Sequence, residues 1–224
     1  MSHPSLPPAP RAGLKRRRLK RRCAVLTVAL AVSFCMPADA QTRMPPIPAE
    51  KMTDAQKKAA AEFEGVRGPL TGPWSVMLRS PDMINRARGL SDYLRFKSSL
   101  PPRLSEFVIL ITAREWSQNY EWNAHHGLAL KGGLKPEIAQ AIAEGRRPEG
   151  MAEDEAALYD FCIELHRNKS VSDATYARAL AKFGEQGIVD TVGLSGWYTL
   201  VAMTLNVART PVPAGATPGL KPLP

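Results

Sequence analysis

Cysteine is scarce in this chain. Cys23 and Cys35 lie near the N-terminus, and Cys162 stands alone in the apolar stretch 156–165. A single thiol in the rest of the chain cannot form an intramolecular disulfide. No Cys-x-x-Cys pair and no neighbouring cation indicates an activated thiolate, so Cys162 is interpreted as a small buried hydrophobic residue. It would act as a peroxide-reactive thiol only if it were exposed and activated.

Sustained alternation of apolar and polar residues, the pattern of a half-buried strand, is also missing. Apolar residues recur at helical spacing instead, between helix start and stop signals, and no repeat of fixed period is present. We therefore predict an all-α fold, a single-domain helical bundle. The helices are expected over 53–67, 80–97, 102–116, 120–131, 135–145, 154–166, 172–184 and 188–207, with a loop over 68–74.

The N-terminus lacks a hydrophobic run long enough to cross a bilayer. Fourteen mostly apolar residues, Cys23 to Met36, follow a dense basic block, whereas a spanning helix needs about 20 residues. Ala38-Asp39-Ala40 places small residues at the −3 and −1 positions of a cleavage site before Gln41. Residues 1–40 are thus predicted to be a secretory signal peptide, and the mature protein to be periplasmic or secreted. An uncleaved anchor is the alternative.

Excess charge is absent once this leader is set aside. The whole chain carries a formal charge of +9, but residues 1–40 hold eight basic residues and one acidic residue. The remaining 22 basic and 20 acidic residues give the mature chain a charge of about +2. The basic isoelectric point therefore belongs to the leader, and no nucleic-acid partner is expected.

The mature chain divides into three parts by composition. Residues 41–52 are proline-rich and are predicted to be a flexible arm. Residues 53–210 form the predicted helical domain, and residues 211–224 form a Pro/Gly-rich tail that is expected to be loosely ordered.

One segment of the domain, 188–207, is long and apolar enough to resemble a membrane span. It contains Asp190 and several Ser, Thr and Gly residues, and such polar content is costly in lipid. Trp197-Tyr198 lies in the middle of the segment, whereas interfacial aromatics lie at the ends of a span. We interpret the segment as a helix buried in the core or at a subunit interface. No stable membrane span is expected after signal cleavage, and a homo-oligomer is expected.

The stretch Tyr120 to His126, with the sequence Tyr-Glu-Trp-Asn-Ala-His-His, is the main candidate for chemistry. Glu121 and His125 are four residues apart, so they lie on one face of a helix. Away from bulk water, a carboxylate and an imidazole within reach of each other can exchange a proton near neutral pH. The alternative is an exposed helix pair that contributes a few tenths of a kcal/mol. His126 projects about 100° away, so no metal site is expected from these residues.

The residues around this stretch carry a family resemblance. They are Leu100-Pro-Pro-Arg103-Leu-Ser-Glu106-Phe-Val-Ile-Leu110, Tyr120-Glu121-Trp122, His125, Ala129, Gly133-Leu134 and Glu137-Ile138. In this pattern the chain resembles, from about Gly68 to about Asn206, the carboxymuconolactone decarboxylase family of the alkyl hydroperoxidase D-like group. The resemblance implies all-helical subunits that form homo-oligomers.

The resemblance also implies a chemistry. In decarboxylases of this family, a carboxylated lactone loses carbon dioxide and leaves an electron-rich centre that must be protonated. The resemblance implies that His125 acts as acid or base and that Glu121 polarises or orients it. It implies no metal and no organic cofactor, because the conjugated acceptor of the substrate holds the electrons.

Three further side chains are candidates for contact with a small, carboxylated substrate: Glu106, Arg114 and Tyr120. The alternatives are structural ion pairs for Glu106 and Arg114 and core packing for Tyr120. An arginine suits the recognition of a carboxylate, and Arg88 and Arg103 are alternatives to Arg114.

The chain departs from the wider group in one respect. Hydroperoxidase-type members use a Cys-x-x-Cys pair near a histidine on this helix, and residues 120–131 contain no cysteine.

We therefore predict an exported, carboxy-lyase-like enzyme with cofactor-independent acid/base chemistry on a small carboxylated or cyclic compound. That compound differs from carboxymuconolactone, whose decarboxylation belongs to intracellular catabolism. The alternatives are a non-catalytic oligomeric protein that binds a small ligand, or a peroxiredoxin-like activity by family label.

Overall fold

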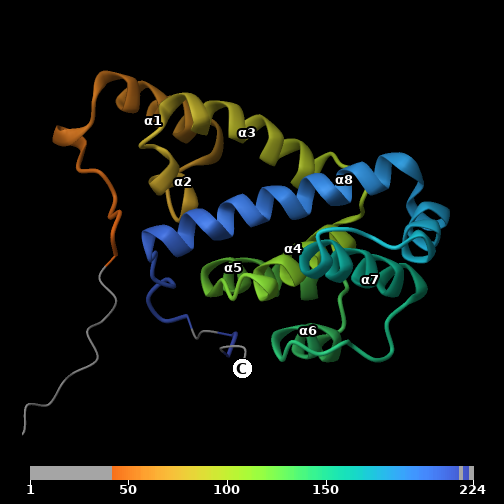
Figure 1. The fold of residues 1–224 in the computed structure, drawn as a ribbon. Helices are drawn as coiled ribbons and strands as arrows, with labels where there is room; N and C mark the ends of the chain where they lie inside the picture. The colour runs from red at the N-terminus through yellow and green to blue at the C-terminus, as the bar shows by residue number, and fades with distance from the viewer. Residues whose placement is uncertain (1–41, 217–218, 222–224) are drawn as a thin grey trace, which may run out of the picture. The chain divides into compact units, whose positions relative to one another are not determined.

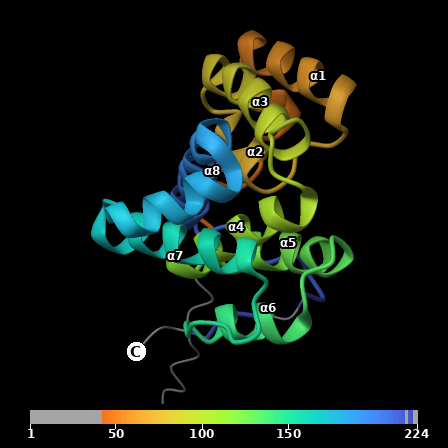
Figure 2. The same ribbon diagram turned by 90° about the vertical axis from the view of Figure 1, so that its right-hand side faces the viewer.

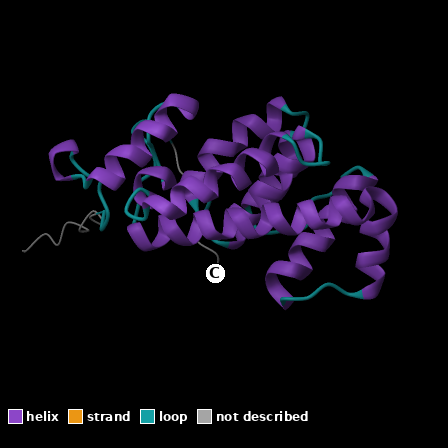
Figure 3. Cartoon of the chain, turned by 90° about the horizontal axis from the view of Figure 1, so that it is seen from above, coloured by secondary structure: helices purple, strands orange, loops and turns teal. Residues whose placement is uncertain are grey.

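The computed structural model describes residues 42–216 and 219–221, and all regular structure in those residues is helical (Figure 3). The predicted signal peptide lies outside the described residues. The predicted all-α class is confirmed. The elements are η1 (Ala49–Lys51), α1 (Asp54–Arg67), α2 (Pro73–Met77), α3 (Pro81–Phe96), α4 (Pro102–Glu115), α5 (Asn119–Lys131), α6 (Pro136–Ala143), α7 (Glu153–Asn168) and α8 (Asp173–Ala208).

Local sequence signals explain most helix starts. Thr53 and Gln56 form a reciprocal capping box, in which the Thr53 hydroxyl accepts from the Gln56 amide at 3.3 Å. Helices α2, α3, α4 and α6 each begin on a proline, whose fixed φ suits the first helical position. Ser80 precedes α3, but its side chain makes no capping hydrogen bond, so Pro81 marks the start of this helix. Pro73 opens the short helix α2 in a segment that we expected to be loop.

Helix α8 joins two segments that the sequence predicted separately. Gly184 has non-helical dihedrals, φ 65° and ψ 178°, as expected for the glycine that ends the first segment. The backbone returns to helical geometry directly afterwards and continues to Ala208. By length and composition α8 could cross a membrane, but 56% of its most apolar window is buried within the protein. That burial agrees with the interpretation of a core helix.

Figures 1 and 2 show α8 between two groups of helices, with α1, α2 and α3 on one side and α4 and α7 on the other. Helix α4 packs against α5, α6, α7 and α8, and every residue from Phe107 to Arg114 is buried. Such burial on all sides explains why this helix carries a continuous apolar run. Helix α5, which follows α4 after a short link, is thereby held against the core.

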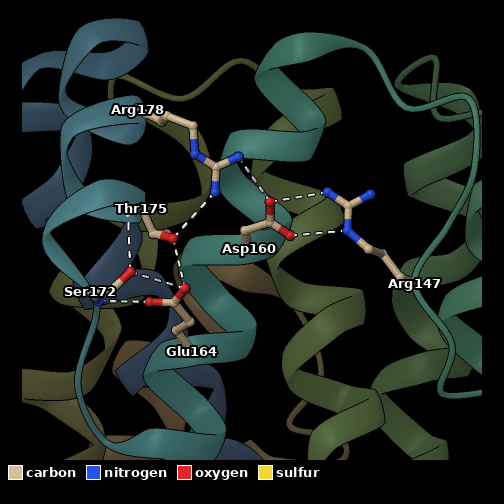
Figure 4. A network of polar contacts seen from close by, with 6 residues as sticks. All are labelled: Arg147, Asp160, Glu164, Ser172, Thr175 and Arg178. Atoms are coloured by element: carbon tan, nitrogen blue, oxygen red, sulfur yellow. Dashed lines mark hydrogen bonds and ion pairs between the residues drawn. The ribbon is translucent and has the colours of Figure 1, made fainter.

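Side-chain networks fix α7 against its neighbours (Figure 4). The Asp160 carboxylate accepts hydrogen bonds from two arginines, one in the loop before α7 and one on α8. The Glu164 carboxylate accepts from the first turn of α8, where it adds to the cap provided by Ser172. The remaining members of the network are Arg147, Thr175 and Arg178.

The predicted flexible arm lies against the end of α8. The Arg43 amide and the Thr42 hydroxyl both donate to the Ala208 carbonyl, at 2.7 and 3.2 Å. Arg79 Nη2 donates to the Pro45 carbonyl at 2.6 Å. The described part of the arm is therefore held by hydrogen bonds to the unpaired carbonyl at a helix end, which composition alone does not reveal.

The tail is also docked where the structure describes its last residues. Leu220 is buried, and its amide donates to Asn119 Oδ1 at 3.0 Å. Gly219 lies so close to Trp122 that a Cβ atom would come within 2.2 Å of the indole nitrogen. The expectation of a loosely ordered tail is therefore wrong for residues 219–221, because one leucine and a close glycine contact anchor them.

Candidate active site

A cavity of about 210 Å³ lies beside His125. Helix α5 forms one wall, α8 and α2 form the others, and residues at the ends of α1 and α3 close it. The lining residues are Arg67, Thr71, Pro73, Trp74, Ser91, Arg95, Tyr120, Glu121, Ala124, His125, Trp197, Tyr198 and Val201.

His125 is held by hydrogen bonds on both ring nitrogens. Its Nδ1 lies 2.6 Å from Glu106 Oε2 on α4, so Nδ1 carries the proton and donates to the carboxylate. Its Nε2 lies 3.2 Å from the Tyr198 hydroxyl on α8, and the two rings meet edge to face. Burial raises the pKa of Tyr198 well above its ordinary value, so the phenol stays protonated and donates to Nε2. Glu106 therefore presents the basic nitrogen of His125 on the cavity side.

Glu121 is the second titratable group at this position. Its Oε2 lies 3.5 Å from His125 Nε2, and the side chain is almost completely buried. Burial raises the pKa of Glu121, against the opposing effects of His125 and Arg95. The cavity therefore holds a carboxyl with a raised pKa, a candidate proton donor, beside the imidazole of His125, a candidate proton acceptor.

The structure brings together most of the predicted site residues. His125, Glu121 and Tyr120 all line the cavity. Glu106 does not line it; it stands behind His125 and orients the imidazole. Its predicted contact with substrate is therefore replaced by a contact with the histidine.

Arg114 lies elsewhere. Its Nη1 donates to the carbonyls of Ala143 and Lys221, at 3.1 and 2.7 Å, and its side chain is buried near the tail. It therefore joins α4, α6 and the C-terminal residues, and the geometry does not support its predicted contact with substrate. Arg103, the alternative candidate for carboxylate recognition, forms ion pairs with Asp154 and Glu155.

Sequence reasoning missed the cavity residues that come from other helices. Arg67 and Arg95 lie on α1 and α3, among several arginines with no distinguishing pattern. Trp197 and Tyr198 were interpreted as core or interface aromatics, and both are buried while also lining the cavity. Their position in the middle of an apolar helix was the only available signal.

Thiol and metal chemistry find no support in the described residues. Cys162 is fully buried, and burial raises the pKa of its thiol to about 12. This agrees with the interpretation of a buried hydrophobic residue and opposes a peroxide-reactive thiolate. Within residues 42–216 and 219–221, no group of three His, Cys, Asp or Glu side chains is placed to hold a metal ion.

Comparison with solved structures identifies the fold. The alkylhydroperoxidase D core of a peroxidase-related protein from Ralstonia eutropha JMP134 superposes with a TM-score of 0.63 and 16% identity, over 77% of this chain and 93% of that one. A protein from Agrobacterium tumefaciens described as a putative antioxidant defence protein of the same type gives 0.57 and 16%, over 64% and 99%. The debrominase Bmp8 in complex with 2,3,4-tribromopyrrole gives 0.60 and 13%, over 77% and 92%. The chain thus has the alkyl hydroperoxidase D-like fold that the resemblance implied.

No family model and no curated protein sequence matches the chain.

Proposed function

We propose that this chain is an exported enzyme that performs cofactor-independent acid/base chemistry, of decarboxylase or lactone type, on a small carboxylated or cyclic compound. The observation that carries the proposal is the partly buried Glu106–His125 pair, at 2.6 Å, with His125 and Glu121 lining one cavity. Proton transfer requires a protonated acid and an unprotonated base in the same site.

We assign each of these three residues a role in catalysis. A bound compound displaces the Tyr198 hydroxyl from His125 Nε2, which then accepts a proton from the compound, and the Glu106 carboxylate stabilises the imidazolium that results. Protonated Glu121 donates a proton to the centre that becomes electron-rich, for example after carbon dioxide leaves. In a decarboxylation, the electron pair of the broken bond passes into the conjugated acceptor of the compound, and the donated proton forms the new carbon–hydrogen bond. The imidazolium of His125 then returns its proton to the Glu121 carboxylate, whose Oε2 lies 3.5 Å from Nε2, so both groups regain their starting states.

A protein of similar fold is described with a small cyclic compound bound, which supports a substrate of this type for the present chain. That protein, Bmp8, is in complex with a tribromopyrrole, which is a single small ring. The cavity beside His125 is of matching scale, at about 210 Å³, and includes Tyr120, Trp74 and Trp197. We propose that the compound of this chain is likewise one small ring.

A peroxiredoxin-like activity is disfavoured by the chain's own residues. Helix α5 contains no cysteine, and Cys162 is buried with a raised pKa. A non-catalytic ligand-binding protein is the competing proposal, because the same cavity would bind without turnover. It would need neither the proton on Nδ1 nor a protonated Glu121.

Export remains part of the proposal. Residues 1–40 carry the features of a secretory signal peptide, so we place the mature chain, from Gln41 onward, in the periplasm or outside the cell. The compound should therefore be available outside the cytoplasm.

The first experiment is a turnover screen with the mature chain, residues 41–224. Carboxylated lactones and related cyclic acids would be followed by ultraviolet absorbance, with wild type and His125→Ala measured side by side. General acid/base catalysis contributes about 100- to 10,000-fold, so His125→Ala should lower kcat by at least about 100-fold while ligand still binds. Turnover that survives in the variant would contradict the assignment. Binding without turnover of any compound in the wild type would favour the binding protein.

A further inference from the structure

Two arginines line the cavity, and one of them is already neutralised. Arg67 Nε donates to Asp92 Oδ1 at 2.8 Å, and its Nη2 donates to Ser91 Oγ at 3.3 Å. Its guanidinium also lies over the Trp74 ring, 5.1 Å from the centroid. Because an aspartate and a hydroxyl use this fork, Arg67 forms part of the wall and adds no uncompensated charge.

Arg95 is different. Its Nε is buried and has no hydrogen-bond partner among the residues that the structure describes. Its Nη2 lies 3.8 Å from Glu106 Oε1, beyond hydrogen-bond distance, while the other oxygen of Glu106 binds His125. A guanidinium carries five donors in a fixed fork, so Arg95 keeps donors free for a planar acceptor such as a carboxylate.

The other arginines considered for substrate recognition are occupied elsewhere. Arg88 donates to the Glu62 carbonyl at 2.7 Å, and Arg103 and Arg114 have the structural partners already described. Arg95 is therefore the arginine, among these and Arg67, that both lines the cavity and retains unused donors.

The size and charge of the cavity limit what can bind. A volume of about 210 Å³ corresponds to the share of about seven water molecules in the liquid, which is room for one small ring. Glu106, 3.8 Å from Arg95 Nη2, already offsets part of the Arg95 charge, so the free donors of Arg95 can hold one carboxylate. A second buried carboxylate would remain unpaired at high cost. Trp74, Trp197 and Tyr120 supply an aromatic wall for the ring.

We propose that this cavity binds a single-ring monocarboxylate, with its carboxylate on Arg95 and its ring against the aromatic wall. The inference rests on the proposed function, since it names the substrate class and the recognition residue of the same site. Arg95 is thus a specificity residue from α3, separate from the acid/base pair on α5.

The test is a binding measurement that needs no turnover. Benzoate, benzamide and isophthalate would be titrated into the mature chain and followed by calorimetry, with 2-furoate and its amide as a second ring. The variants are Arg95→Gln, Arg95→Lys and His125→Ala. Arg86→Gln is the matched control, because Arg86 is an exposed residue of the same helix that does not line the cavity.

We expect the wild type to bind each monocarboxylate at least 10-fold more tightly than its amide, and more tightly than isophthalate. Arg95→Gln should abolish that preference without weakening the amide, Arg95→Lys should retain part of it, and Arg86→Gln should retain all of it. Failure of the wild type to bind either monocarboxylate, or a preference that persists in Arg95→Gln, would overturn the proposal.

The same variants separate this proposal from the proposed function. A carboxylate preference that depends on Arg95, in a protein that turns over no compound, would support the recognition site and refute the enzyme. Turnover that depends on His125, together with a carboxylate preference that is unchanged in Arg95→Gln, would support the enzyme and refute the recognition site.

Discussion

At the residue scale, the site depends on one imidazole between groups that control its protons. The Glu106 carboxylate accepts from Nδ1, and the Tyr198 hydroxyl donates to Nε2. Exchange of Glu106 would remove the acceptor that holds the proton on Nδ1. The buried Glu121 adds a proton that, unlike that of an exposed carboxyl, is retained above the usual titration range.

Glu121 should also leave a signature in the stability of the fold. Its pKa is raised in the folded state, so between the ordinary value of 4.5 and the raised value the folded protein binds more protons than the unfolded one. The free energy of unfolding should therefore fall with rising pH through that window, and Glu121 is then destabilising above it. We expect Glu121→Gln to be more stable than wild type near pH 7, and to lose this advantage below pH 4.5.

Urea unfolding as a function of pH would measure this difference. The exposed Glu185→Gln is the control, because it removes the same charge without relieving a buried carboxyl. Equal pH dependence in Glu121→Gln and wild type would show that the carboxyl titrates normally.

At the scale of elements, the ends of helices decide what surrounds the site. Gln118 caps α5 by accepting from the Tyr120 amide at 2.6 Å, which fixes where the helix begins and hence which face carries His125. The short helix α2 brings Trp74 onto the cavity, and Gly72 before it has no room for a Cβ atom, which would lie 2.5 Å from the Tyr120 hydroxyl.

Arg114 provides a test of structural against functional roles at this scale. It links α4 to the Ala143 carbonyl on α6 and to the Lys221 carbonyl in the tail. A hydrogen bond to a charged group contributes about 1.5–3 kcal/mol, so Arg114→Met should lower the free energy of unfolding by about 2 kcal/mol. Urea unfolding would measure the loss, with exposed Arg86→Met as the control. If Arg114→Met left the stability unchanged but weakened ligand binding, Arg114 would have to be assigned a contact with substrate.

At the scale of the whole molecule, α8 carries apolar side chains that the described chain does not cover. Val189, Val192, Leu200, Met203 and Val207 are exposed. Their spacing places them along one side of the helix, the pattern of a helix-to-helix contact. We propose that this side of α8 packs against a second copy of the chain, in line with the homo-oligomer that the resemblance implies.

Light scattering after size exclusion would test the assembly. We expect the mature wild type to be larger than a monomer, and the double variant Val189→Glu, Met203→Glu to shift to monomer by burying unpaired charge at the contact. Leu90→Glu, an equally apolar and exposed position on α3, should keep the wild-type mass. A monomeric wild type, or an unaffected double variant, would contradict the proposal.

The sequence by itself determined the local features of this protein. Capping residues, prolines and glycines fixed the ends of most helices, and the four-residue spacing of Glu121 and His125 placed them on one face, because these are properties of a few consecutive residues. The leader over residues 1–40 and the near-neutral charge of the mature chain stay predictions from the sequence.

Only the tertiary structure decided which residues complete the site. Glu106 and His125 are 19 residues apart, and Tyr198 and His125 are 73 apart, so their contacts arise from the packing of α4, α5 and α8. Arg95 and Arg114 look alike in sequence, yet one faces the cavity and the other joins the tail. Helical spacing fixes directions around one axis, whereas the partner across the core depends on how the axes pack.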